Sequence, residues 1–184
     1  MSLLKFLNEE EIAIYDDEFT WAQRNDMYDF IVNSKFTISA RDVDERVETS
    51  VSNMPFMISE WNEYDVSQFG IFRHIKNKNE DLLSQIIDNR TLKRCFVNCD
   101  TGREVHHVHT HSGQHVLLYQ ANLEWNHEWY GETFFYDDNK EDVVQVNSYT
   151  PGRLIWFNGE IPHSFRPPSR VAPFFRFTVS FFFE

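Results

Sequence analysis

The sequence is poor in cysteine and in long apolar runs. Its two cysteines, Cys95 and Cys99, are too few for a disulfide framework, and on one strand they would lie about 13 Å apart, beyond disulfide reach. We therefore expect buried apolar residues or free thiols. No segment approaches the roughly 20 apolar residues of a membrane span, and the apolar run within residues 1–8 is too short for a signal peptide. These absences predict a cytoplasmic protein without a membrane segment.

Basic residues are also scarce. Lysine and arginine number 17 against 29 acidic residues, which gives a formal net charge of −12 with neutral histidines. A protein that holds nucleic acid normally carries a basic stripe that neutralises phosphates. The acidic residues here are spread along the whole chain, so nucleic acid is disfavoured as a partner. The oligomeric state is left open by these features.

Short apolar runs separated by turn signals dominate the chain after residue 92. They recur about every ten residues, with turns such as Asp100-Thr101-Gly102 and Pro151-Gly152 between them. The runs cover residues 94–98, 104–110, 115–123, 132–136, 143–147, 153–157 and 174–183. Regular short strands with such punctuation are typical of a β-sandwich or a barrel.

Residues 1–92 have a different pattern, which includes apolar spacing typical of helices. Apolar spacing predicts helices over 18–32 and 79–88, and short strands over 12–15 and 35–39, with a loop over 40–60. We therefore expect one α+β domain in which residues 1–92 support a barrel formed by residues 93–184. Helices of the first part would pack on one sheet of that barrel.

Histidines cluster in the barrel region, where seven of the eight fall between residues 106 and 163. Alternation along a strand puts His107, His109 and His111 on one face, so either neighbouring pair could bind an ion. The turn at Ser112-Gly113 favours His109 and His111, because ligands at a strand end remain accessible. His163 would complete a triangular face and leave coordination positions open, as a metal that binds substrate requires.

Several short motifs follow one another in this region. In chain order they are His109-Thr110-His111, Tyr119-Gln120-Ala121-Asn122, Trp125, Gly131-Glu132-Thr133-Phe134-Phe135, Pro151-Gly152-Arg153, Phe157, His163 and Arg176-Phe177-Thr178. This order resembles the iron(II)- and 2-oxoglutarate-dependent dioxygenases, in particular their prolyl-hydroxylase-like branch. The resemblance covers about residues 94 to 184. It implies a double-stranded β-helix, or jelly-roll barrel, that binds Fe(II), 2-oxoglutarate and O2. It also implies hydroxylation of a small-molecule or peptide substrate, with 2-oxoglutarate decarboxylated to succinate.

One position departs from that family, which has a carboxylate where this chain has His111. A neutral imidazole offsets less of the charge of a divalent ion. Three readings follow: His109, His111 and His163 hold the metal, Glu132 supplies the carboxylate, or the site binds no catalytic metal.

The resemblance also implies a cation for the far carboxylate of 2-oxoglutarate. Arg176 lies on an aromatic strand with Thr178 on its face, and a charge in such a run requires an anionic partner. Tyr119 is the predicted second donor. Further candidates are Asn122 and Arg166 for the site, and Trp125, Trp129 and Tyr130 for a substrate pocket. Two alternatives stand beside this hypothesis: a cupin-type three-histidine dioxygenase that uses no 2-oxoglutarate, and a non-enzymatic barrel that only binds a partner.

Overall fold

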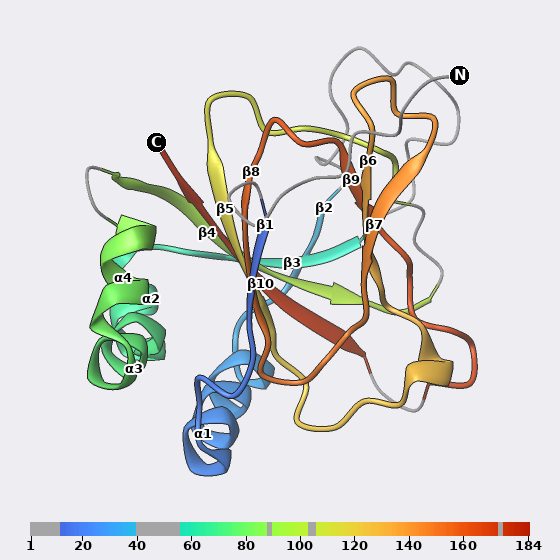
Figure 1. The fold of residues 1–184 in the computed structure, drawn as a ribbon. Helices are drawn as coiled ribbons and strands as arrows, with labels where there is room; N and C mark the ends of the chain where they lie inside the picture. Colours follow the sequence, from blue (N-terminus) through green and yellow to red (C-terminus); the bar gives the residue numbers. More distant parts are fainter. Residues whose placement is uncertain (1–11, 40–55, 88–89, 103–105, 173–174) are drawn as a thin grey trace.

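The computed structural model describes residues 12–39, 56–87, 90–102, 106–172 and 175–184, and within them two antiparallel sheets and a set of short helices (Figure 1). The seven-stranded sheet has the order β1-β8-β5-β10-β4-β3-β2, and the three-stranded sheet has the order β7-β6-β9. The strands are β1 Ile12–Tyr15, β2 Thr37–Ser39, β3 Phe56–Trp61, β4 Leu92–Asp100, β5 His115–Gln120, β6 Thr133–Tyr136, β7 Val143–Asn147, β8 Leu154–Asn158, β9 His163–Phe165 and β10 Arg176–Phe183. The helices are α1 Trp21–Val32, α2 Glu63–Phe69, α3 Ile71–Lys78, α4 Glu80–Ile87 and the 3-10 turn η1 His127–Trp129.

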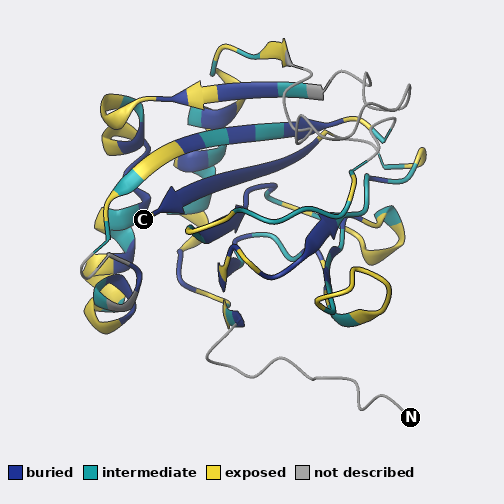
Figure 2. Cartoon of the chain, turned by 90° about the horizontal axis from the view of Figure 1, so that it is seen from above, coloured by how far each residue is buried: buried dark blue, intermediate teal, exposed yellow. Residues whose placement is uncertain are grey.

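Strand β10 is the centre of the large sheet. It pairs with β4 on one side and β5 on the other, both antiparallel, and every one of its residues is buried. Figure 2 shows this strand dark blue where it runs to the C-terminus. Because side chains alternate along it, Phe177 and Phe181 face one side of the sheet while Arg176 and Thr178 face the other.

The helices cover the outer side of the large sheet. Their apolar residues, including Met27, Phe69 and Ile75, form one core with the outward face of β10. Helix α1 begins at a capping box between Thr20 and Gln23, which satisfies backbone N–H groups of its first turn. Figure 1 shows these helices on the side of the sheet away from β6, β7 and β9.

A second, smaller core lies between the two sheets. Val116, Leu118 and Phe182 of the large sheet meet Phe135 of β6 there, and Phe165 of β9 packs against the group. The inward face of β10 therefore looks into a space that both sheets enclose. Any polar side chain on that face is buried between the sheets.

This architecture confirms the predicted α+β layout with helices packed on one sheet. The strands predicted after residue 114 are all present, within a few residues of their expected ends. Cys95 and Cys99 are both buried free thiols, as expected. Among the described residues, no helix is both long and apolar enough to cross a membrane.

Three expectations were wrong. The loop predicted over 40–60 gives way at Phe56 to strand β3, which pairs with β4; residues 40–55 lie outside the described part. The strand predicted over 104–110 is reduced to a single bridge at His109, with residues 103–105 not described. Helices α2 and α3 were not predicted, because each is only two turns long and the single left-handed Gly70 both ends one and begins the other.

The central strand generates a stability prediction. Phe181 is fully buried and its ring contacts Phe69 and Phe72, so F181A should lower the free energy of unfolding by about 3–5 kcal/mol. The control F175A truncates a half-exposed ring and should change stability by less than about 1 kcal/mol. Urea denaturation measures both, and equal effects would contradict the packing described.

Candidate metal centre

Two backbone hydrogen bonds join His109 to His163. The N–H of each residue donates to the carbonyl oxygen of the other at 3.0 Å, which makes an antiparallel bridge between a loop and β9. Directly paired residues in an antiparallel bridge project their side chains to the same side. The two imidazole centroids accordingly lie 4.5 Å apart.

His111 is placed by contacts with a second segment. Its N–H donates to the Gly159 carbonyl at 2.7 Å, and the Gly159 N–H donates to the Gln114 carbonyl at 2.7 Å. A Cβ on Gly159 would lie 2.6 Å from the carbonyl oxygens of His111 and Gln114. Only glycine therefore allows this close approach, so Gly159 is a site residue that the sequence reasoning missed. In the sequence, Asn158-Gly159 indicated only a turn that ends a strand.

The three histidines form a group that could hold a metal ion. One nitrogen from each of His109, His111 and His163 lies within 4.8 Å of the others, and His111 is 4.9 and 5.1 Å from the other two rings, centroid to centroid. These are the residues predicted from the sequence as the metal face. Among the described residues, the group contains no carboxylate.

Two of the rings have a fixed tautomer. Nδ1 of His163 lies 2.8 Å from the Ile161 carbonyl, and Nδ1 of His109 lies 2.9 Å from the His107 carbonyl. A carbonyl oxygen only accepts, so each Nδ1 carries the proton and each Nε2 presents a lone pair. Burial, followed by the electrostatic effect of the neighbouring His109, lowers the pKa of His163 to about 3. At neutral pH this ring is therefore an uncharged donor.

His111 differs because a cation contacts it. Arg94 Nη2 lies 3.3 Å from His111 Nδ1, and a guanidinium only donates, so the proton of neutral His111 lies on Nε2. Burial, then His163, His109 and Arg94, lower the pKa of His111 to about 2. Burial is thus the main reason that the ring stays neutral, while Arg94 competes with a metal for Nδ1.

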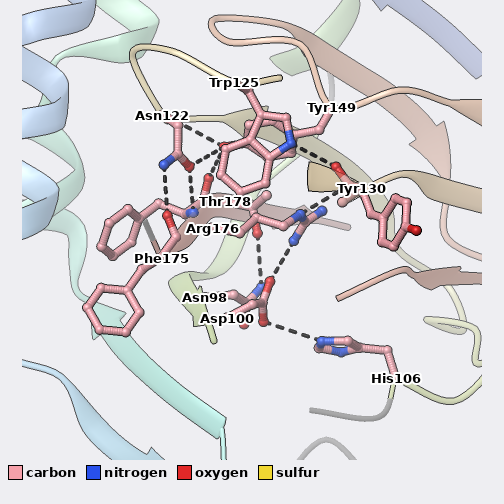
Figure 3. Close-up of polar contacts among 12 residues, drawn as sticks. Asn98, Asp100, His106, Asn122, Trp125, Tyr130, Tyr149, Phe175, Arg176 and Thr178 are labelled. Carbon is pink, nitrogen blue, oxygen red and sulfur yellow. Dashed lines mark hydrogen bonds and ion pairs between the residues drawn. The ribbon is translucent and has the colours of Figure 1, made fainter. Parts of the chain in front are cut away.

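A second polar group surrounds Arg176, which is 1% exposed on the inward face of β10. Its Nη1 donates to Asp100 Oδ2 at 2.6 Å and its Nε donates to the Gly131 carbonyl at 3.1 Å (Figure 3). Asp100 also lies 3.3 Å from His106 Nε2. The predicted anionic partner of Arg176 therefore exists within the chain. Asp100 and His106 were not predicted for this role, because the Asp-Thr-Gly pattern indicated only a turn.

The histidine group and the arginine lie around the same aromatic ring. The centroid of Phe165 is 6.1 Å from that of His163 and 5.2 Å from the guanidinium carbon of Arg176. Arg176 Nη2 is buried and has no hydrogen-bond partner among the residues described, and the same holds for Gln120 Nε2. Gln120 pairs directly with Thr178, so it shares the inward face with Thr178 and Arg176. Two buried donors are therefore left for a ligand that accepts hydrogen bonds.

Tyr119 was predicted to join Arg176 in the site, and this is wrong. Tyr119 pairs with Val179, which puts its ring on the outer face of the sheet. There it packs against Phe19 and Phe69, with centroids 5.4 and 6.0 Å away. Alternation along β5 gives the inward position to Gln120 instead.

Glu132 and Arg166 lie outside the metal group. Their side chains pair at 3.7 Å, and the guanidinium carbon of Arg166 lies 3.3 Å from the centroid of the Tyr130 ring. Glu132 directly precedes the inward-facing Thr133 on β6, so its carboxylate points the other way. The alternative in which Glu132 replaces His111 as a ligand is therefore not borne out.

The Asn122 side chain forms hydrogen bonds with Tyr149 and with the backbone at the start of β10. Its side-chain amide donates to the Phe175 carbonyl, and its Oδ1 accepts from the Phe177 N–H at 2.8 Å and from the Tyr149 hydroxyl at 2.7 Å. The Oδ1 atom and one amide N–H of Asn122 are therefore used within the chain (Figure 3). The Tyr149 ring that Asn122 contacts has its centroid 5.1 Å from the guanidinium carbon of Arg176.

The candidates for a substrate pocket, Trp125, Trp129 and Tyr130, lie together next to Tyr149. Trp125 donates to the Tyr130 carbonyl at 2.7 Å and packs on Tyr149 and Trp129, at 4.7 and 5.6 Å between centroids. Tyr130 has a positive φ of 65°, uncommon outside glycine, and leads into Gly131. A Cβ on Gly131 would lie 3.2 Å from the Arg176 side chain. This segment therefore closes over Arg176.

Comparison with known proteins identifies the fold. Neither a family model nor a curated protein matches the sequence. Solved structures do match, among them a prolyl hydroxylase from Trichoplax adhaerens in complex with a hypoxia-inducible-factor peptide, at 17% identity and TM-score 0.59, over 94% of this chain and 83% of that one. HygX from Streptomyces hygroscopicus, with nickel and 2-oxoglutarate bound, matches at 11% identity and TM-score 0.64, over 96% and 87%. A 2OG-Fe(II) oxygenase family oxidoreductase from Burkholderia pseudomallei matches at 9% identity and TM-score 0.64, over 96% and 86%. The predicted double-stranded β-helix is thereby confirmed.

The contact at Gly159 predicts a defect in metal binding. In G159A the new methyl group must push His111 away, so affinity for manganese(II) should fall about tenfold or more. The control G113A adds a methyl group in open space in the adjacent turn, where only its left-handed φ is strained. It should lower stability by about 1–2 kcal/mol and leave metal affinity unchanged. Calorimetric titration of both variants tests this, and equal affinities would contradict it.

The lowered histidine pKa values predict a pH dependence in metal-free protein. In the unfolded chain the His163 imidazole has a pKa near 6.5 and is protonated below that pH, whereas in the folded protein burial keeps it neutral down to about pH 3. The contribution of His163 to the free energy of unfolding should therefore be at its maximum above pH 6.5. It should decrease from pH 6.5 toward pH 5 by about 1.4 kcal/mol per pH unit. H163Q should show a shallower slope in urea denaturation with a chelator present. The exposed-site control H127Q should keep the original slope, and a slope unchanged in H163Q would refute the assignment.

Proposed function

We propose that the protein is an Fe(II)- and 2-oxoglutarate-dependent oxygenase that hydroxylates a peptide or a small molecule. The observation that carries the proposal is the group formed by His109, His111 and His163 beside the buried Arg176, both inside a double-stranded β-helix. The group supplies three imidazoles, of which His111 also contacts Arg94, and Arg176 supplies a buried cation on the inward face of β10. The matched oxygenase structures share the fold, which supports the class without identifying the substrate.

The three histidines would hold the metal. Imidazole nitrogens suit iron, and a three-residue face leaves positions open for further ligands. A bound iron(II) supplies the sites at which a 2-oxo acid and O2 react. The histidines orient that face through the carbonyls of Ile161 and His107, which fix the rings of His163 and His109. Phe135 and Phe157 pack on the His163 ring and exclude water from that side.

Arg176 and Gln120 would bind the far end of 2-oxoglutarate. The free Nη2 of Arg176 and Nε2 of Gln120 are buried donors on one face of the sheet, about 7–8 Å apart at their Cβ atoms by their diagonal register. Thr178 lies between them and adds a hydroxyl. Phe165 separates this end from the histidines. These groups would hold the far end of the 2-oxo acid by hydrogen bonds.

The substrate would approach at the segment that contains Trp125, Trp129 and Tyr130. Trp129 and Tyr130 are partly exposed beside the closed arginine site, and Arg166 lies on the Tyr130 ring. An aromatic surface with one cation suits a ring-bearing or peptide substrate. We place the protein in the cytoplasm, in accordance with its two free buried thiols.

Turnover of the cosubstrate tests the proposal. Tag-free protein with iron(II), O2 and ascorbate should release succinate from 2-oxoglutarate, and H163A and R176A should each lower that release by at least about 100-fold. H127A and R170A remove the same residue types at exposed positions and should retain full activity. Far-UV circular dichroism confirms folding of each variant.

Three outcomes separate the candidate functions. Succinate release that persists in both H163A and R176A would refute the assignment. Oxygen uptake that depends on His163 but needs no 2-oxoglutarate would favour a cupin-type dioxygenase, which the all-histidine metal group also suits. Less than about a tenth of a metal ion per chain after loading would favour a barrel that only binds a partner.

A further inference from the structure

Arg176 already has a counter-ion before any ligand binds. Its Nη1 lies 2.6 Å from Asp100 Oδ2, and both side chains are 1% exposed. The two residues pair directly in the register of β4 and β10, so the backbone holds the carboxylate opposite the guanidinium. The strand register therefore places the two charges next to each other inside the sheet.

Asp100 is held in its charged form. Burial opposes ionisation, but the nearby His106 and Arg176 outweigh that effect, and the pKa of Asp100 lies below its usual value. His106 Nε2 approaches the second carboxylate oxygen at 3.3 Å, on the side away from Arg176 (Figure 3). The negative charge therefore stays next to the arginine across the neutral pH range.

We propose that Asp100 is a specificity-determining residue that makes the far end of the 2-oxo acid pocket electrically neutral. The proposal rests on the proposed function and refines it. The pocket then recognises the far end of its ligand as a hydrogen-bond acceptor, and a second negative charge brings no advantage. A ligand carboxylate beside Arg176 gains attraction from the guanidinium but also meets repulsion from the nearby Asp100 carboxylate.

The donors that remain fit such a ligand. Nη2 is the guanidinium nitrogen of Arg176 that has no partner among the described residues, because Nη1 donates to Asp100 and Nε donates to the Gly131 carbonyl. A side-on grip on a carboxylate, which needs the single N–H of Nε together with Nη2, is thereby blocked. One N–H from Arg176 and one from Gln120 can bind a carbonyl oxygen whether it belongs to a carboxylate or to an ester.

Binding of two matched ligands tests the inference. 2-Oxoglutarate and its C5 methyl ester chelate a metal through the same keto and C1 carboxylate oxygens and differ only at the far end. Calorimetric titration into protein loaded with manganese(II) should give dissociation constants within about threefold of each other. In D100N, which keeps the shape but removes the charge, 2-oxoglutarate should be preferred by about tenfold or more. D138N removes an exposed aspartate and should leave the original ratio unchanged.

Each outcome decides. A preference of the wild-type protein for 2-oxoglutarate clearly above about threefold would overturn the inference, and this measurement needs no variant to fold. Binding of 2-oxoglutarate with the same ratio in folded D100N and in the wild type would also overturn it, while the proposed function stands. Failure of the metal-loaded wild type to bind either 2-oxo acid would instead reject the proposed function, and the inference with it.

Discussion

The reciprocal backbone hydrogen bonds between His109 and His163 are the constraint on which the candidate site depends. These residues are far apart in the sequence, and a pair of 3.0 Å bonds puts their side chains on one side. His111 follows because the Gly159 carbonyl receives its N–H where no side chain would fit. Backbone hydrogen bonds thus bring the three imidazoles of the metal face together. The bridge continues from β9 of the small sheet. In the large sheet, the outer face of β10 packs on the helices and its inner face carries Arg176.

Charge balance distinguishes this interior from a simple anion pocket. The pKa values of His111 and His163 are lowered, and Arg94 adds a positive charge beside His111. Within the part of the chain that the structure describes, the three-histidine group contains no carboxylate to offset the charge of an ion. At the other end the positive charge of Arg176 is offset by Asp100. The pocket is therefore short of negative charge at the metal and neutral at the far end. An anionic group of the ligand is best accommodated at the metal.

The sequence predicted the elements that follow strong local rules. Strands from His115 onward obey alternation with clear turn signals, and the three histidines stood out by spacing. Helices α2 and α3 could not be predicted in this way, because they are short and Gly70 both ends α2 and begins α3. Tyr119 was assigned to the wrong face, since alternation separates two faces but does not say which one looks inward. The partnership of Asp100 with Arg176 spans 76 residues, and only the pairing of β4 with β10 creates it.

The central claim is that three imidazoles from separated segments bind one ion. X-ray absorption spectroscopy of tag-free protein loaded anaerobically with one equivalent of iron(II) measures this most directly. The account predicts one ion per chain with a first shell that contains three imidazole nitrogens. A shell with no more than one imidazole, or an ion that remains bound unchanged when His109, His111 and His163 are all replaced, would contradict it.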